Sequence, residues 1–165
     1  MEKNMVKLRF FLIALFFTFI SIGSLSAQTD NRLNGRWVAV IEELTIEYRF
    51  NNGNFEISAN GLLNEKGTYT TSNGNFIRTS THIHGDFMNV IFNDIGIKLD
   101  SKWYTINEFI IAVKPSLVKL GFSDRDINNF INTLVSSTTS FPYSIDANNL
   151  ILTDTNGGVI IFTKK

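Results

Sequence analysis

The stretch RLNGRWVAV, residues 32–40, places one of the chain's two tryptophans just after a glycine, at the start of the first β-like run. Glycine adopts backbone conformations that other residues avoid, so Gly35 permits a sharp change of direction. Trp37, Ala39 and Ile41 then share one face of a strand, because side chains alternate between faces. The stretch predicts that the chain turns into a strand whose first inward side chain is very large.

Alternating segments continue beyond this stretch, and turn sequences separate them. Residues 44–50, LTIEYRF, alternate apolar and polar side chains, and Asn-Gly pairs at 52–53 and 73–74 are typical of tight hairpins. Five strands are predicted before residue 85 and three at the C-terminal end. Their residues are 37–42, 44–50, 55–59, 66–72, 76–84, 140–145, 150–153 and 158–164.

Residues 86–136 lie between the fifth and sixth predicted strands and have a helical pattern. Asp86 is expected to cap a first short helix. Thr105 and Glu108 have the spacing of a capping box at the start of a second helix, which Pro115 is expected to end or bend. A third, amphipathic helix follows.

Eight antiparallel strands joined by tight turns bury one face best by closing into an up-and-down barrel, which also removes exposed strand edges. The sequence therefore predicts a mainly β fold: one eight-stranded antiparallel barrel domain, residues 28–165, with a helical insertion between strands five and six. The insertion, about residues 86–136, is expected to be a lid over the barrel mouth, a packing element or partner surface, or additional core. Trp103 and Tyr104 are candidates for its hinge or rim, although such aromatic residues more often belong to a core.

The first 27 residues have the three parts of a secretory signal peptide. Lys3, Lys7 and Arg9 form a positive head, residues 10–22 form an apolar run, and small residues lead to Ala27. The run is shorter than the roughly 20 residues of a membrane-spanning helix, so we expect cleavage near Ala27. The chain has no cysteine, which excludes a lipid-modified N-terminal cysteine. We therefore expect a secreted or periplasmic protein.

Removal of residues 1–27 leaves 138 residues with a net charge of −2, enough for one domain with its own core. Nucleic-acid binding requires a clustered basic face, and an anionic membrane surface requires a basic patch. The sequence predicts neither surface. We expect no nucleic-acid partner, no membrane association after cleavage and a monomer whose core alone stabilises it.

The residues around Trp37 resemble a family signature. Gly35-Arg36-Trp37 is similar to the G-x-W motif of the lipocalins, in which the tryptophan closes one end of the barrel and a basic residue of the last strand packs over its ring. Cation–π packing of this kind contributes about 0.5–1 kcal/mol at exposed sites. The resemblance implies a barrel-closing motif of Gly35, Trp37 and Lys164. Residues 33–84 and 139–165 also resemble small secreted bacterial proteins described as lipocalin-like.

Aromatic side chains dominate the strand faces that are expected to point into the barrel. A barrel of eight strands either fills with side chains or holds one small ligand, and apolar, aromatic linings suit hydrophobic ligands. The sequence leaves both outcomes open. The candidate ligand-binding residues are Tyr48, Phe50, Phe55, Ile57, Tyr69, Phe141 and Tyr143.

The only two histidines, His82 and His84, lie two residues apart on the fifth predicted strand, and Asp86 follows. This spacing can supply two zinc ligands, but a zinc site needs at least a third, for which Asp86 is the local candidate. Arg78 has the same phase as the histidines, and its charge opposes a metal. We expect no metal and no cofactor.

The apolar phase of the same strand, which contains Ile77 and Ile83, indicates which face of the strand points into the barrel. We expect this phase to face the lumen, although the pattern is too short to decide. The histidines are then expected on the outer wall, near the helical insertion.

Signatures of catalysis are missing from the sequence, which has no cysteine nucleophile, G-x-S-x-G, H-E-x-x-H or phosphate loop. We therefore expect a protein that is not an enzyme. The predicted function is non-covalent binding or sequestration of a small hydrophobic molecule in a secreted, lipocalin-like barrel. The alternative is a protein-interaction or inhibitor module with a solid barrel core.

Overall fold

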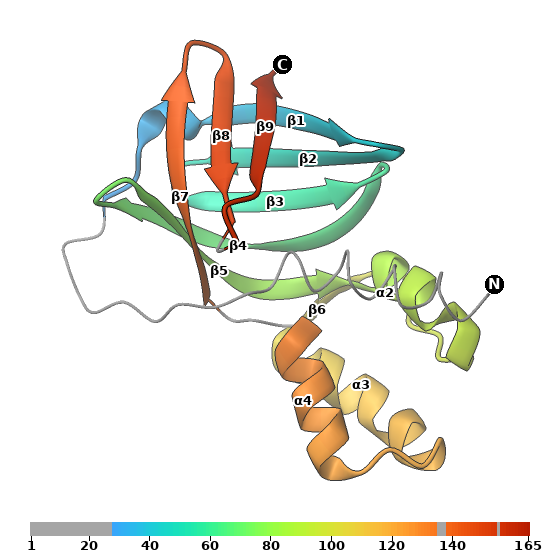
Figure 1. Cartoon of the computed structure of the whole chain (residues 1–165). Helices are drawn as coiled ribbons and strands as arrows, with labels where there is room; N and C mark the ends of the chain where they lie inside the picture. Colours follow the sequence, from blue (N-terminus) through green and yellow to red (C-terminus); the bar gives the residue numbers. More distant parts are fainter. Residues whose placement is uncertain (1–27, 135–137, 155) are drawn as a thin grey trace.

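The computed structural model describes residues 28–134, 138–154 and 156–165, and its centre is a closed antiparallel β-barrel (Figure 1). The expected signal peptide, residues 1–27, lies outside the described residues. The prediction of a mainly β fold with an eight-stranded antiparallel barrel and a helical insertion is confirmed. The barrel strands are β1 (Gly35–Ile41), β2 (Leu44–Asn51), β3 (Asn54–Ala59), β4 (Leu62–Ser72), β5 (Asn75–His84), β7 (Thr138–Asp146), β8 (Asn149–Thr153) and β9 (Val159–Lys164).

The barrel closes because every one of these strands has a neighbour on both sides. The order around the ring is β4-β3-β2-β1-β9-β8-β7-β5, and β5 pairs with β4 to complete it. β1 pairs with β2 along its whole length but meets β9 through two residue pairs, Trp37–Lys164 and Val38–Thr163. β7, β8 and β9 cross β1, β2 and β3 at a steep angle in Figure 1. The strands of the ring are therefore joined through the fewest residue pairs at Trp37, the tryptophan of the G-x-W stretch.

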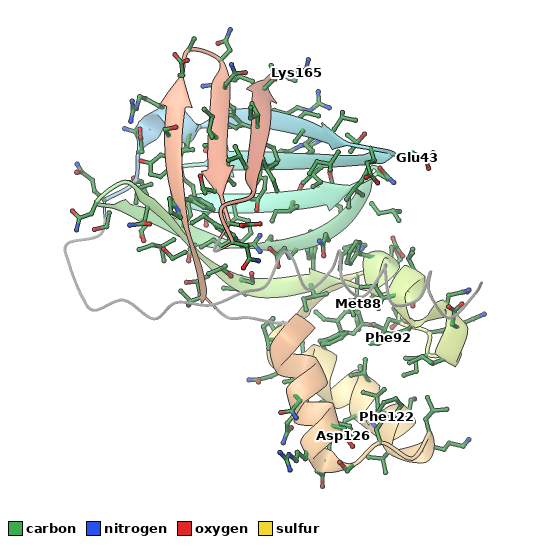
Figure 2. All side chains as sticks on the ribbon, in the orientation of Figure 1. Glu43, Met88, Phe92, Phe122, Asp126 and Lys165 are labelled. Atoms are coloured by element: carbon green, nitrogen blue, oxygen red, sulfur yellow. The ribbon has the colours of Figure 1, made fainter. Side chains whose placement is uncertain are left out.

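The insertion between β5 and β7 builds a second apolar core. Ile83 at the end of β5 packs there with Met88, Phe92 and Phe109. Figure 2 shows Met88 and Phe92 between the barrel and the hairpin formed by the last two helices of the insertion, residues 106–119 and 124–134. Phe122 lies at the outer tip of that hairpin (Figure 2). No helix in the described ranges is long and apolar enough to cross a membrane. The elements of the insertion are α2 (Gly85–Phe92), η2 (Asn93–Ile95), β6 (Trp103–Thr105), α3 (Ile106–Lys119) and α4 (Asp124–Leu134).

The start of the insertion differs from the sequence prediction in two ways. Trp103 and Tyr104, candidates for a hinge or rim or for a core, belong to a short additional strand, β6, which pairs with the end of β5, and Tyr104 is buried in the second core. The N-cap of α2 is His84 rather than Asp86, because His84 Nδ1 accepts a hydrogen bond from the Asp86 backbone N–H at 3.3 Å. β6 therefore joins the insertion to the barrel sheet by backbone pairing.

The capping box of α3 is confirmed. Thr105 Oγ1 accepts a hydrogen bond from the Glu108 N–H at 3.2 Å, and Glu108 Oε2 accepts one from the Thr105 N–H at 2.8 Å. Pro115 was expected either to end or to bend this helix. The helix does not end there but continues to Lys119. Side-chain packing of α3 into the second core stabilises the helix beyond its proline.

The inward phase of the first half of β5 is opposite to the predicted one. Phe76, Arg78 and Ser80 are 0%, 1% and 5% exposed, whereas Ile77 is only half-buried. Arg78, which was expected on the outer wall with the histidines, therefore points into the barrel.

A β-bulge explains this correction. Lys66 pairs with His82 and Gly67 pairs with Ser80, so Thr81 is an extra residue of β5 without a partner in this ladder. A bulge of one residue reverses the alternation of side chains. Ile83 follows the bulge and is buried, but in the second core rather than in the barrel core, whereas Ile77 precedes the bulge and is only half-buried. Continuous alternation was the wrong assumption for this strand.

Trp37 is fully buried at one end of the barrel, next to the short 3-10 helix η1 (Asn31–Leu33). Its Nε1 donates a hydrogen bond to the Leu33 carbonyl at 2.6 Å. Lys164 Nζ lies 5.0 Å from the centroid of the Trp37 ring and donates to the Arg32 carbonyl at 3.1 Å. The lysine thereby links the last strand to both the tryptophan and η1. We call this end of the barrel the closed end.

Gly35 is required where the chain leaves η1 for β1. Its φ of +124° lies in a region that side chains disfavour, and a Cβ atom would lie 3.1 Å from Lys164 Cε. The structure therefore brings Gly35, Trp37 and Lys164, the three residues of the proposed barrel-closing motif, into one contact.

A second contact at the closed end involves Asp30. Its Oδ2 accepts a hydrogen bond from the Tyr143 hydroxyl at 2.9 Å and lies 2.6 Å from Arg32 Nη2. The hydrogen bonds from Arg32 lower the pKa of Asp30 from 3.8 to about 2, against the opposing effect of burial, and Tyr143 adds to the lowering. Asp30 thus holds η1 against β7 as a carboxylate.

Replacing Trp37 with alanine is expected to destabilise the protein by about 3–5 kcal/mol, because a fully buried ring and its hydrogen bond are removed. The measurement is urea unfolding followed by circular dichroism. Trp103→Ala is the matched control, and we expect a smaller loss because Trp103 is only half-buried. A loss below about 1 kcal/mol for Trp37→Ala would show that the closed end does not depend on this residue.

Acid is expected to weaken the closed end through Asp30. A carboxyl whose pKa is lower in the folded state stabilises the fold above its unfolded pKa of about 3.8 and loses this contribution as the pH falls towards about 2. Asp30→Asn should therefore remove part of the drop in unfolding midpoint between pH 4 and pH 2. Asp100→Asn, at a side chain that is 82% exposed, is the control and should leave that drop unchanged.

Candidate functional site

A buried ion pair lies inside the barrel. Arg78 Nη1 of β5 contacts Glu65 Oε1 of β4, and the two side chains are 1% and 4% exposed. Arg78 Nη1 also donates to the Tyr48 hydroxyl at 2.9 Å, and Ser80 Oγ donates to Glu65 Oε2 at 3.1 Å. We call these four residues, together with Thr139, which pairs with Arg78 across β5 and β7, the polar layer.

The surroundings keep Arg78 charged. Burial alone disfavours its charged form, but the negative charge of Glu65 and the contact with Tyr48 outweigh burial and raise the pKa of Arg78 above its ordinary value. The rings of Phe55 and Phe141 lie on the same guanidinium, with centroids 5.9 and 5.6 Å from Arg78 Cζ. Their π-faces attract the cation, so the pair is held by both charge and rings.

Tyr48 is neutral in this setting. Burial raises its pKa to about 12, and the charge of Glu65 adds to this while Arg78 opposes it. The Tyr48 hydroxyl thus accepts the hydrogen bond of Arg78 without carrying a charge of its own. The net charge of the polar layer is zero, because one cation faces one anion.

Thr139 has a buried hydroxyl that no other described residue satisfies. The residue is 1% exposed, and its Oγ1 has no hydrogen-bond partner in the described part of the chain. Cross-strand partners share a face of a sheet, so Thr139 points inward with Arg78. An unsatisfied buried polar group costs about 1–3 kcal/mol, and a bound molecule that satisfies it recovers this free energy.

The structure gathers the seven candidate ligand-binding residues in one core. Tyr48 stacks on Phe50 with 5.2 Å between centroids, and Phe50 meets Tyr69 edge to face at 5.0 Å. Phe76 and Phe162 extend this ring cluster. The closed-end side of the barrel is therefore filled by rings that contact one another, and we call it the aromatic half. Five of the seven candidates are buried members of the barrel core, and the last two are partly buried and pack against it: Tyr48, Phe50, Phe55, Ile57, Tyr69, Phe141 and Tyr143.

Inward side chains beyond the polar layer are aliphatic or small. Ala39 of β1 and Ile46 of β2 are cross-strand partners that are 3% and 1% exposed, and Ile46 also pairs with Ala59 of β3. We call this region the aliphatic half. The polar layer thus separates an aromatic half from an aliphatic half that contains two alanines.

The metal candidates do not converge with a third ligand. His84 Nδ1 lies 3.6 Å from Asp86 Oδ2, and its ring packs edge-on against Trp103 at 4.9 Å between centroids. His82 Nδ1 instead lies 2.9 Å from Thr81 Oγ1. Within residues 28–134, 138–154 and 156–165, no group of three or more histidine, cysteine or acidic residues has a metal-binding arrangement. His84 serves as a helix cap rather than as part of a paired H-x-H site.

The polar layer is the part of the candidate site that sequence reasoning missed. Arg78 was expected on the outer wall, and the predicted fourth strand, residues 66–72, did not include Glu65, although most Glu and Arg side chains that become buried are paired. A signal was present in β4, where Glu65, Gly67 and Tyr69 share one phase. Because Tyr69 was expected to point inward, Glu65 should have been placed inward too. The phase of Arg78 was hidden by the bulge.

Comparisons of the chain with protein-family models, with curated proteins and with solved structures found no significant match. The geometry of the barrel interior therefore carries the functional argument.

Breaking the buried pair from one side is expected to destabilise the fold strongly. Glu65→Leu should cost about 3–5 kcal/mol, because it removes the buried carboxylate that faces the Arg78 cation. The double variant Glu65→Leu, Arg78→Met should cost much less than the sum of the two single changes, since no unpaired charge remains. Urea unfolding of the four proteins completes the double-mutant cycle. Additive losses would contradict a direct interaction between the two side chains.

Proposed function

We propose that the protein binds a small, largely apolar molecule non-covalently inside the barrel, with a polar end at the polar layer. The observation that carries this proposal is the buried set of Glu65, Arg78, Ser80 and Thr139 within an otherwise apolar interior. A few convergent polar groups in an apolar lining are typical of sites for small molecules. A barrel shaped only for stability gains nothing from an unsatisfied hydroxyl at Thr139.

The two halves of the interior support different roles. The aromatic half is occupied by rings in mutual contact, which suits a closed base. The aliphatic half has Ala39 and the half-buried Ala59 as the two cross-strand partners of Ile46, and we propose that these small side chains leave more of the cross-section to an apolar ligand. We therefore propose that the ligand lies in the aliphatic half and meets the candidates Phe55, Ile57 and Phe141 near the polar layer.

We also propose that this binding protein is a monomeric, lipocalin-like protein without catalytic activity, which acts outside the cytoplasm after cleavage near Ala27. The basic, apolar and small-residue segments of residues 1–27 support export, and the closed barrel with Gly35, Trp37 and Lys164 at its base supports the lipocalin-like architecture. The sequestration role follows from the proposed interior site.

The binding proposal is tested with a pair of variants at neighbouring positions of β1. Ala39 is 3% exposed and points inward, whereas Val40 is 68% exposed and points outward. Ala39→Phe should reduce binding of the neutral fluorescent probe N-phenyl-1-naphthylamine at least tenfold, because the added ring occupies the aliphatic half. Val40→Phe should leave binding unchanged. Fluorescence titration measures both, and circular dichroism checks that each variant is folded.

Two results would reject the proposal. One is a folded wild-type protein that binds neither the probe nor any lipid in a native mass spectrometry screen. The other is a folded Ala39→Phe variant that binds the probe as tightly as the wild type, since the bound probe would then lie outside the barrel.

A protein-interaction module is the second candidate function. The observation that favours it is the exposure of apolar side chains at the end of α3 and in the turn to α4, where Val118, Leu120 and Phe122 are 51%, 50% and 43% exposed. Figure 2 shows Phe122 at the tip that lies away from the barrel. This candidate remains if the wild-type barrel binds no small molecule.

A further inference from the structure

The charge balance of the polar layer restricts which molecules the barrel accepts, provided that the interior site of the proposed function exists. An arginine alone in an apolar barrel would attract an anion such as a carboxylate. Here the guanidinium of Arg78 already contacts the carboxylate of Glu65, and both side chains are almost completely buried. A second buried anion would compete with Glu65 for Arg78 and repel it at short range.

A cationic end group is disfavoured by the same pair. Glu65 Oε1 contacts Arg78, and Glu65 Oε2 accepts the hydrogen bond of Ser80 at 3.1 Å. An ammonium group would therefore have to displace Ser80 or face the Arg78 cation. Charged groups lose several kcal/mol when they leave water without a partner of opposite charge. The polar layer therefore has no excess of positive or negative charge that could pair with a charged ligand.

Thr139 supplies a hydroxyl of the polar layer that remains to be satisfied. Thr139 pairs with Arg78 across the β5–β7 ladder and is 1% exposed, and its Oγ1 has no hydrogen-bond partner among the described residues. A hydroxyl both donates and accepts one hydrogen bond or more, so it matches an alcohol, a carbonyl or an amide equally well. None of these groups brings a charge into the barrel.

We propose that the polar layer is a subsite for an uncharged hydrogen-bonding group at the end of an apolar molecule, with Thr139 as the residue that binds it. The ligand class is therefore neutral amphipathic molecules, such as long-chain alcohols and amides, rather than fatty-acid anions or alkylammonium cations. The site excludes both kinds of ion by the mutual neutralisation of Arg78 and Glu65.

The test uses ligands with the same ten-carbon chain and different end groups. Decan-1-ol, decanamide, decanoate and decyltrimethylammonium compete with N-phenyl-1-naphthylamine for the wild-type protein at pH 7. We expect the two neutral ligands to displace the probe at concentrations at least tenfold below those of both ions. Since the mature chain has a net charge of −2, weaker binding of the anion alone would reflect the whole protein, whereas weaker binding of both ions reflects the buried layer.

Two variants link this preference to the residues. Thr139→Val keeps the shape of the side chain and removes the hydroxyl, and we expect it to weaken decan-1-ol about three- to tenfold, the effect of one hydrogen bond. Thr138→Val is the matched control at the exposed neighbouring residue and should have no effect. Glu65→Gln removes the negative charge with little change in shape, so decanoate should gain at least tenfold relative to decan-1-ol.

The outcomes separate this inference from the proposed function. If the probe does not bind to the wild-type protein, the proposed function fails and this subsite with it. If the probe binds but decanoate or the ammonium ligand competes as well as the alcohol, the proposed function stands and the neutral subsite is rejected. The same conclusion follows if a folded Thr139→Val variant binds decan-1-ol as the wild type does. These readouts do not require Glu65→Gln to fold.

Discussion

The joint between the first and last strands is the constraint on which the rest of the barrel depends. A sheet becomes a barrel only when its two ends meet, and here β1 and β9 meet through the pairs Trp37–Lys164 and Val38–Thr163. Side-chain contacts strengthen this junction, because the backbone pairing between β1 and β9 is short. Lys164 lies over the ring of Trp37 and reaches the Arg32 carbonyl, while the indole donates to Leu33. The contact of Trp37 with Lys164 and Leu33 therefore joins the strand ends and buries the tryptophan ring at the same place.

The barrel interior differs along its axis: one part stabilises the fold, and another contains buried polar groups that cost stability. Rings that contact one another fill the aromatic half, which stabilises the closed end by burying large apolar surfaces. The polar layer above them is costly by comparison, because ions lose hydration when they are buried. Arg78, Glu65 and Thr139 nevertheless lie there, at the boundary with the small side chains of the aliphatic half. Groups that conflict with stability in this way are expected at functional sites.

The strands and their turns could be predicted because their signals are local. Alternation in residues 44–50 and the Asn-Gly turns depend on side-chain periodicity and backbone preference, which neighbouring residues decide. Likewise, the capping box of Thr105 and Glu108 is complete within four residues. The first half of β5 failed because the phase of a strand is relative to its partner. The extra residue at Thr81 appears only when β4 and β5 are aligned.

The candidate site was predictable only in its apolar part. Aromatic residues on inward phases had to meet in the core, so Tyr48, Phe50 and Tyr69 could be assigned to it in advance. The polar partners could not, because Glu65 and Arg78 lie 13 positions apart and are brought together by the β4–β5 pairing and the bulge. Charged residues are usually solvated, which made the outer wall the more natural place for Arg78.

By itself, the sequence determined a mainly β chain of eight barrel strands, an inserted helical segment and a tryptophan beside a glycine at the entry to the first strand. These features follow from periodicity, turn chemistry and capping, which act over a few residues. Only the tertiary structure decided that Lys164 covers Trp37, that Arg78 turns inward to Glu65 and that Thr139 is left without a partner among the described residues. The reason is that closing a barrel sets strand register and side-chain direction together, and both are properties of strand pairs rather than of any one segment.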